Sequence, residues 1–230
     1  LVYKETAAGG KFDTAVFIKS IKDTFNKDNT VIIPTFNFDF CKGVSFDYKK
    51  SPSQVGILGD YALKDTDFKR TKHPIYSFAV YGKDQETLTS LDYKDAFGDE
   101  SVFSYMYHGN AFQIGIGINT YTANHFVEEH FFSDTIPYRF IKNFSAGYID
   151  ENGNRSPREY SMFVRNLELN TVINTAPFKK CLIDTGIVKV TYMNEIPFYE
   201  TYVKNYCDYA KEDIANNKSR KLVIYDGQND

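Results

Sequence analysis

The sequence predicts a single α/β domain in which a mixed central sheet is flanked by helices. Two observations lead to this prediction. Short β-branched or aromatic runs alternate with segments of helical spacing along the chain, which is typical of α/β folds. The 230 residues suffice for one sizeable domain, and no internal repeat or low-complexity segment divides them. Residues 1–230 are therefore expected to form one domain.

The first predicted elements are a strand, a helix and a second strand. Leu1-Val2-Tyr3 has the character of a strand end, which favours a chain that has lost its first segment. Asp13 is expected to cap a helix over residues 14–26, because apolar residues recur there at helical spacing. The β-branched run at residues 30–35 predicts a buried strand. This order of elements favours a parallel sheet with a crossover helix.

The middle of the chain alternates between loops and regular elements. Residues 36–53 are polar and aromatic without a clear period, and they predict a long surface loop of the kind that is often functional. A second loop is expected over residues 64–76. Hydrophobic periodicity predicts helices over residues 54–63, 85–91, 101–107 and 124–131, and strands over residues 77–82 and 111–118.

The last third of the chain begins with a predicted hairpin. Asp150-Glu151-Asn152-Gly153-Asn154 is a strong turn signal between two runs with strand character. Gly186 is expected to end the helix that precedes it. The predicted elements of this part are strands over residues 138–149, 160–169 and 187–193, and helices over residues 178–185 and 198–217.

Composition excludes several classes of protein. A net charge of −3 argues against a general nucleic-acid binder, which needs a basic surplus. The three cysteines show neither paired spacing nor a nearby histidine, so neither a disulfide framework nor a zinc site is predicted. Free thiols fit a reducing cytoplasm. No apolar run approaches the ~20 residues that span a bilayer.

Among the four histidines, His125 carries the clearest chemical signal. On the predicted helix, Glu128 lies three residues later and therefore shares a face with His125. A carboxylate there can accept a hydrogen bond from one ring nitrogen, which fixes the tautomer and makes the other nitrogen a better base. The His-x-x-Glu spacing is a weak motif by itself, and a surface or packed histidine is the alternative. The zinc motif HExxH is absent.

Three other groups of residues have a chemical interpretation. Arg70, Lys72 and His73 could hold a phosphate or a carboxylate, although a solvated loop explains them equally well. Glycines at Gly115 and Gly117 would let the backbone approach a ligand closely, without matching a dinucleotide-binding fingerprint. Cys41 in the long loop permits a covalent route, but no partner base stands at a readable spacing.

Seven segments occur in a fixed order within roughly the first 190 residues. Each resembles a segment of the aminoglycoside 3-N-acetyltransferase family, and seven in order are a far more specific signal than any one. The segments are Val31-Ile32-Ile33-Pro34-Thr35-Phe36, Ser51-Pro52-Ser53-Gln54-Val55-Gly56, Arg70-Thr71-Lys72-His73-Pro74-Ile75-Tyr76-Ser77-Phe78-Ala79, Phe97-Gly98-Asp99-Glu100-Ser101, Gly115-Ile116-Gly117, residues 122–128, and Tyr138-Arg139.

The resemblance implies an α/β fold distinct from the commoner GNAT acetyltransferase fold. It also implies transfer from acetyl-CoA, as the cosubstrate, to an amine, without a metal ion. His125 would be the base, and Glu128 is assigned as its acidic partner because the family's downstream acidic residue finds no match after Arg139. Residues expected near the pantetheine or the acyl group are Thr35, Ser77, Gly115, Gly117 and Thr122. Residues expected to contact the acceptor are Arg70, His73, Glu129 and Tyr138.

The aromatic loop and the basic residues near Arg70 favour relatives that acylate amino sugars of surface polysaccharides. Two alternatives stay open at this point: an enzyme that inactivates aminoglycoside antibiotics, and a catalytically silent CoA-binding relative. A homo-oligomer is also compatible with the sequence. The discriminating observation is acetyl transfer to amino sugars compared with transfer to aminoglycosides.

Overall fold

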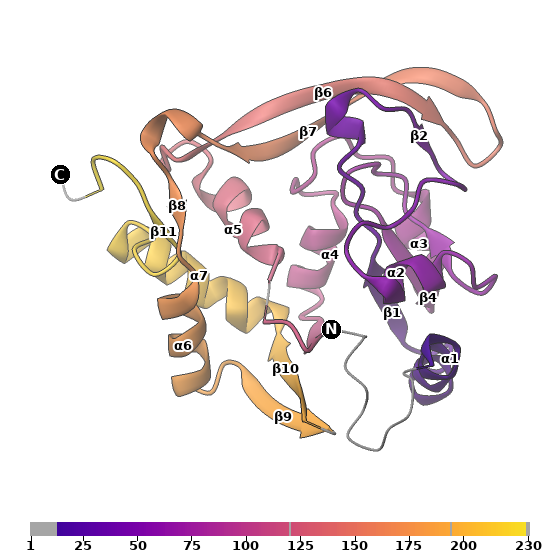
Figure 1. Ribbon diagram of the computed structural model, residues 1–230, viewed down its shortest axis with the longest axis horizontal. Coiled ribbons are helices and arrows are strands. Elements are labelled where there is room, and N and C mark those ends of the chain that lie inside the picture. Colours follow the sequence, from indigo (N-terminus) through magenta and orange to yellow (C-terminus); the bar gives the residue numbers. More distant parts are fainter. Residues whose placement is uncertain (1–12, 120, 194, 229–230) are drawn as a thin grey trace.

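The computed structural model describes residues 13–119, 121–193 and 195–228 (Figure 1). The helices of these residues are α1 (Thr14–Phe25), α2 (Ile57–Ala62), α3 (Gln85–Ser90), α4 (Val102–His108), α5 (Ala123–Phe132), α6 (Ala176–Asp184) and α7 (Val203–Asn217). The strands are β1 (Thr30–Pro34), β2 (Phe46–Asp47), β3 (Lys69–Arg70), β4 (Phe78–Gly82), β5 (Phe112–Ile116), β6 (Arg139–Ile149), β7 (Arg155–Arg165), β8 (Val172–Ile173), β9 (Lys189–Met193), β10 (Ile196–Tyr202) and β11 (Val223–Ile224). Two short 3-10 helices lie at Phe40–Lys42 and Leu167–Leu169.

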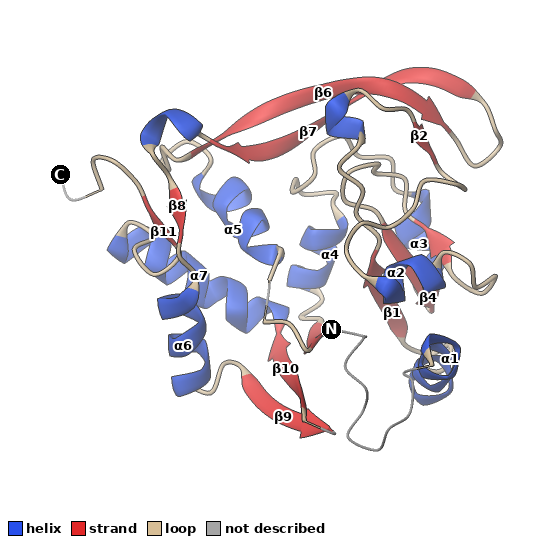
Figure 2. Ribbon diagram, in the orientation of Figure 1, coloured by secondary structure: helices blue, strands red, loops and turns tan. Residues whose placement is uncertain are grey.

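The fold class is α/β, as predicted, and helices and strands mix throughout the described chain (Figure 2). The strands of the described residues form four small sheets, with the orders β1-β4-β3, β5-β10-β9, β8-β11 and β2-β6-β7. Strand β1 pairs with β4 in antiparallel orientation, and its predicted parallel pairing with the strand at residues 1–3 stays a prediction. The predicted strand at Leu1–Tyr3 lies outside the described residues.

The predicted start of α1 is confirmed, whereas α2 is shorter than predicted. Asp13 Oδ1 accepts hydrogen bonds from the backbone of Ala15 at 2.8 Å and of Val16 at 3.1 Å, which is the usual role of an N-cap aspartate. The expected start of α2 at Gln54 is wrong, because the backbone and side chain of Gln54 bond to the backbone of Phe36 and Phe38. This tie to the preceding loop delays the helix until Ile57.

The closing helix also begins later than predicted. Residues 198–202 read as helical in the sequence, but they belong to β10, which pairs with β5 on one side and β9 on the other. Helix α7 starts only at Val203. Pairing with two neighbouring strands overrides the local pattern here, because strand propensity depends on the neighbours that a strand finds.

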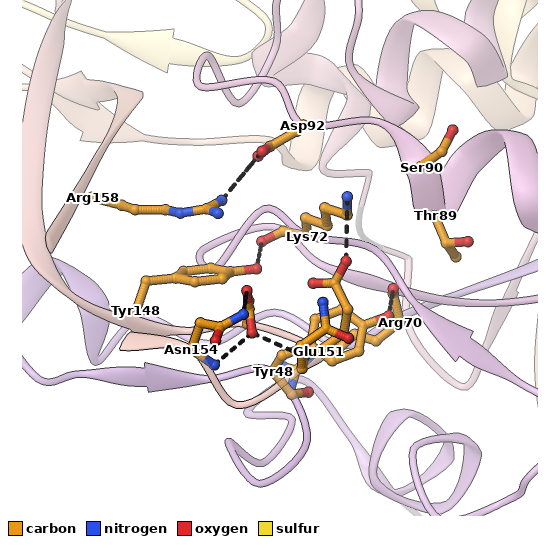
Figure 3. Close-up of polar contacts among 12 residues, drawn as sticks. Tyr48, Arg70, Lys72, Thr89, Ser90, Asp92, Tyr148, Glu151, Asn154 and Arg158 are labelled. Atoms are coloured by element: carbon orange, nitrogen blue, oxygen red, sulfur yellow. Dashed lines mark hydrogen bonds and ion pairs between the residues drawn. The ribbon is translucent and has the colours of Figure 1, made fainter. Parts of the chain in front are cut away.

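The long hairpin of β6 and β7 arches across the top of the molecule, over α5 on one side and the β1–β4 sheet on the other (Figure 1). Asp150 closes its turn by accepting hydrogen bonds from the backbone of Asn152 and Asn154. Near this turn, Tyr148 bonds to the carbonyl of Lys72, and Lys72 pairs with Glu151 at 3.5 Å (Figure 3). These contacts fasten the hairpin to the loop before β4.

One large core built mainly from aromatic and aliphatic side chains runs from the loop after β1 to β11. A smaller core lies between α1, α2 and the β1–β4 sheet. Helix α5 packs against α7 within the larger core. Among the described residues, no helix is both long and apolar enough to cross a membrane.

Candidate functional site

Helix α5 places the predicted catalytic pair. Phe126 and Val127 are fully buried in the core and hold the helix in place. With that face fixed, His125 and Glu128 lie together one turn apart, as predicted from their spacing. The side chain of His125 is 30% exposed, whereas that of Glu128 is only 3% exposed. The imidazole therefore reaches the surface while its carboxylate partner stays inside.

The geometry of the pair suits a general base. His125 Nδ1 lies 2.8 Å from Glu128 Oε2, and the rings of Phe97 and His125 form a T-shaped pair with a centroid distance of 5.9 Å. With Nδ1 donating to the carboxylate, Nε2 is the nitrogen that can accept a proton. The pair thus fixes both the tautomer and the orientation of the ring.

The carboxylate of Glu128 is stabilised in its ionised form. Burial raises its pKa, but the ion pair with Arg139 and the hydrogen bond from His125 oppose burial, and the net pKa is lowered. Arg139 Nε lies 2.8 Å from the same Oε2 that faces His125. The predicted pair is therefore part of a triad of side chains.

Sequence reasoning missed the role of Arg139. In the sequence Arg139 stands out only as part of the family segment Tyr138-Arg139, because ten residues separate it from Glu128 and no periodic pattern links a helix to the start of the next strand. Tyr138, predicted to contact the acceptor, is buried; its hydroxyl lies 2.8 Å from Ser219 Oγ and also helps to lower the pKa of Glu128. Tyr138 therefore lies in the interior, beside the Glu128 carboxylate, and its contact with the acceptor stays a prediction.

Glu129 is the second acidic residue of this helix and is 5% exposed. Neither of its carboxyl oxygens has a hydrogen-bond partner among the described residues. Burial, and after it the neighbouring carboxyl of Asp95, raise the pKa of Glu129 to about 9. Glu129 is therefore a neutral acid at neutral pH, and its role in acceptor binding stays a prediction.

Arg70, Thr35 and Ser77 form one buried network. Arg70 Nε donates to Ser77 Oγ at 3.0 Å, and Nη2 donates to the carbonyl of Thr35 at 3.1 Å. The hydroxyls of Thr35 and Ser77 lie 2.9 Å apart, and both residues are fully buried. Nη1 donates to the carbonyl of Ser51. Burial lowers the pKa of Arg70 to about 10, which leaves it charged at neutral pH.

These three residues thus hold β1, β4 and the intervening loops together in the described structure. Cofactor contacts by Thr35 and Ser77, and an acceptor contact by Arg70, remain predictions.

His73 is buried, and its ring stacks on Tyr93 at a centroid distance of 5.3 Å. Its Nδ1 accepts a hydrogen bond from the backbone of Tyr76 at 3.1 Å. Burial lowers the pKa of His73 to about 3, so the ring is neutral. Arg70 is enclosed and Lys72 is paired with Glu151. The structure therefore does not assemble the three expected cations into one open anion site, and an acceptor contact by His73 stays a prediction.

The glycines predicted near the cofactor have local structural reasons. A Cβ on Gly115 would lie 2.4 Å from the carbonyl oxygen of Ile118, so the close approach there is made by the chain itself. Gly117 has φ +67 and donates its N–H to the carbonyl of Pro197 at 2.7 Å. Thr122 stands directly before α5, and its carbonyl accepts the N–H of His125. Cofactor contacts by these residues stay predictions.

Cys41 is half-buried in the loop after β1. Burial raises the pKa of its thiol to about 11. A thiol is a poor nucleophile while protonated, so the environment of Cys41 does not favour the covalent route.

Within the described residues, no group of His, Cys, Asp or Glu side chains has the arrangement to hold a metal ion. One cavity of about 360 Å³ lies between the C-terminal ends of α5 and α7, and its lining includes Ile136, Ser219 and Tyr225. A second, of about 310 Å³, lies beside Tyr48 and Arg70. His125 lines neither of these two cavities.

Comparison with known families decides the family of the chain. The model of the aminoglycoside 3-N-acetyltransferase family matches residues 7–212. The chain belongs to this family. As a member, it is an acetyl-CoA-dependent N-acetyltransferase, as the seven ordered segments predicted.

Solved structures share the fold at low sequence identity. The YokD protein from Bacillus subtilis has a TM-score of 0.73 and 18% identity, over 90% of this chain and 82% of that chain. Aminoglycoside acetyltransferase AAC(3)-Xa has a TM-score of 0.73 and 15% identity, over 90% and 81%. AAC-IIIb, solved as a binary complex with CoASH, has a TM-score of 0.71 and 17% identity, over 86% and 81%. No curated protein matches the chain.

Proposed function

We propose that His125 is the general base for direct transfer of the acetyl group from acetyl-CoA to the amine of an amino sugar. The observation that supports this proposal is the 2.8 Å contact between His125 Nδ1 and Glu128, on a partly exposed imidazole. This arrangement leaves Nε2 facing away from the carboxylate and able to take a proton.

The reaction needs such a base because an ammonium group has no lone pair to attack with. Nε2 accepts one proton of the ammonium, the nitrogen lone pair that this frees bonds to the thioester carbonyl carbon, the carbon–sulfur bond breaks, and the nitrogen loses its second excess proton to solvent. The proton on His125 can pass to the departing CoA thiolate, which returns the base to its neutral form. Holding both substrates in one orientation supplies much of the acceleration.

An amino sugar is the proposed acceptor. Support comes from Glu129, which lies four residues after His125 on α5 and so shares its face of the helix, and from the neighbouring Asp95, since carboxyl groups can bond to hydroxyl or amino groups. Lys72, in the loop before β4, and Arg158, on β7, pair with Glu151 and Asp92 (Figure 3) and are cations that would tolerate a phosphate on a carrier-linked sugar. Arg70, His73 and Tyr138 would contact the acceptor. The residues near acetyl-CoA would be Thr35, Ser77, Gly115, Gly117 and Thr122.

An aminoglycoside antibiotic is the second candidate acceptor. It is favoured by the family itself and by solved relatives such as AAC-VIa, which is described in complex with sisomicin. The chemistry at His125 is the same for both acceptors, so the difference concerns the substrate alone.

The experiment is release of free thiol from acetyl-CoA with a panel of amino sugars and aminoglycosides, comparing the wild type with His125→Ala. We expect amine-dependent release that falls by ~10²–10⁴-fold in the variant, the usual contribution of a general base. Near-normal turnover by the variant would refute the base assignment. Measurable CoA binding without release for any amine would favour a catalytically silent protein.

A further inference from the structure

We infer that Arg139 is a positioning residue, which keeps the Glu128 carboxylate charged and oriented so that His125 holds the tautomer of a base. This inference rests on the proposed role of His125. It concerns a side chain on a different element, β6, and it can be tested by a measurement that does not depend on turnover.

The guanidinium of Arg139 is anchored on two sides. Its Nη1 donates to the carbonyl of Phe163 in β7 at 3.2 Å, and its Nε lies 2.8 Å from Glu128 Oε2. The side chain is only 10% exposed. The hairpin backbone thus holds one end of the group, and Nε faces the Glu128 carboxylate as an ion-pair partner, although its N–H has no hydrogen-bond partner among the described residues.

Glu128 needs such a partner because it is enclosed. Its side chain is 3% exposed, and a buried carboxyl without a partner favours the protonated form. The groups that face it are His125 on α5, Arg139 at the start of β6 and Tyr138 directly before it, Tyr76 before β4 and Tyr206 on α7. Of these described groups, Arg139 is the permanent cation. Removing it would leave a neutral carboxyl in contact with the imidazole.

The state of Glu128 determines the tautomer of His125. An ionised carboxylate can only accept, so Nδ1 must carry the hydrogen and Nε2 has the free lone pair. A protonated carboxyl can donate instead, and the hydrogen bond then reverses. Nδ1 becomes the acceptor, Nε2 carries the hydrogen, and the nitrogen that should remove the proton of the amine is no longer a base.

The test compares Arg139→Met with Glu128→Gln, the double variant, Arg139→Lys and the control Arg155→Met. Arg155 lies on the same hairpin and is exposed. We expect kcat of Arg139→Met to fall about 10-fold or more, with little change in KM. The acid limb of the pH–rate profile should move to higher pH, because removing a cation makes the coupled pair bind protons more tightly. Arg139→Lys should keep this limb near its wild-type position, and Arg155→Met should behave as wild type.

The double variant separates positioning from general damage to the fold. If Arg139 acts through Glu128, Glu128→Gln with Arg139→Met should be about as active as Glu128→Gln alone, since coupled residues are non-additive. It should also fold better than Arg139→Met, which leaves a buried carboxyl without its cation. Additive losses, an unmoved pH profile, or a loss expressed as a raised KM for the acceptor would overturn the inference.

A tautomer measurement keeps the inference distinct from the proposed function. Long-range ¹H–¹⁵N NMR of the His125 ring reports which nitrogen carries the hydrogen. We expect hydrogen on Nδ1 in the wild type and a shift towards Nε2 in Arg139→Met. An unchanged tautomer would overturn the inference even if His125→Ala is inactive. If His125→Ala stays active, the base assignment fails while the tautomer result still decides the role of Arg139.

Discussion

Glu128 and Glu129 are adjacent in the sequence and yet differ in charge at neutral pH. Both are buried. Arg139 and His125 lower the pKa of Glu128, whereas burial and Asp95 raise the pKa of Glu129 to about 9. The contrast comes from the partner that each side chain meets, since burial alone raises the pKa of any carboxyl group.

The raised pKa of Glu129 predicts a pH-dependent gain in stability for Glu129→Gln. The folded protein keeps a proton that the unfolded chain releases above its ordinary pKa of 4.5. The free energy of unfolding of the wild type therefore falls as the pH rises from there to about 9. The variant should be more stable by ~1–3 kcal/mol at pH 8 and nearly equal at pH 4. Urea unfolding at several pH values checks this, with exposed Glu212→Gln as the control; a difference independent of pH would contradict it.

Cys41 provides a second prediction for a single residue. Because burial raises the pKa of its thiol to about 11, the thiolate is scarce at neutral pH. Cys41→Ser should retain turnover within about 3-fold of wild type, since the thiolate is the nucleophile and little of it exists. Steady-state thiol release measures this directly. Lost turnover in a folded variant would revive the covalent route.

The sequence allowed part of the site to be predicted. His125 and Glu128 could be paired because three residues on a helix place two side chains on one face. Arg139 and Asp95 could not be paired with them, because their contacts depend on how a hairpin and a loop pack against α5. Local spacing thus predicted the contact between the proposed base and its carboxylate partner, whereas the residues that set the charge of the carboxyl groups could be found only from the fold.

Among the helices and strands too, features set by local chemistry could be predicted and features set by distant contacts could not. The N-cap of α1, the turn at Asp150 and the end of α6 near Gly186 depend on local chemistry, and the sequence predicted all three. The start of α2 and the identity of β10 depend on contacts with distant segments, and both predictions failed. Tertiary contacts override local preference in such places.

Strand β5 gives a prediction about one element. A Cβ at Gly115 would meet the carbonyl of Ile118 at 2.4 Å, a backbone atom that cannot move aside without shifting the chain. Gly115→Ala should therefore cost ~1–3 kcal/mol, in the range of other overpacked positions. Thermal unfolding compared with Ile114→Ala, at a residue on the same strand that is 43% exposed, checks it. Equal stability of the two variants would contradict the steric argument.

For the whole molecule, we predict cooperative unfolding in a single transition. The large core joins residues from the loop after β1, the helices α4 and α5, the β6–β7 hairpin and α7. Loss of any one part would expose apolar surface on the others, so partial unfolding is disfavoured. Calorimetry should give equal calorimetric and van't Hoff enthalpies, as for one domain. Two resolved transitions would instead indicate two domains within the chain.

The proposed base His125 and its carboxylate partner Glu128 lie within one turn of α5, so their contact depends on that helix alone. Its nitrogen-to-oxygen separation is set by the pitch of a single helix, whereas the cation that completes the triad is delivered by a hairpin. Mild heating or denaturant that loosens contacts between elements should therefore separate Arg139 from Glu128 before it changes the distance between His125 and Glu128. Substitutions along the hairpin would then lower the rate of acetyl transfer in part, whereas substitutions in α5 that separate His125 from Glu128 would abolish it.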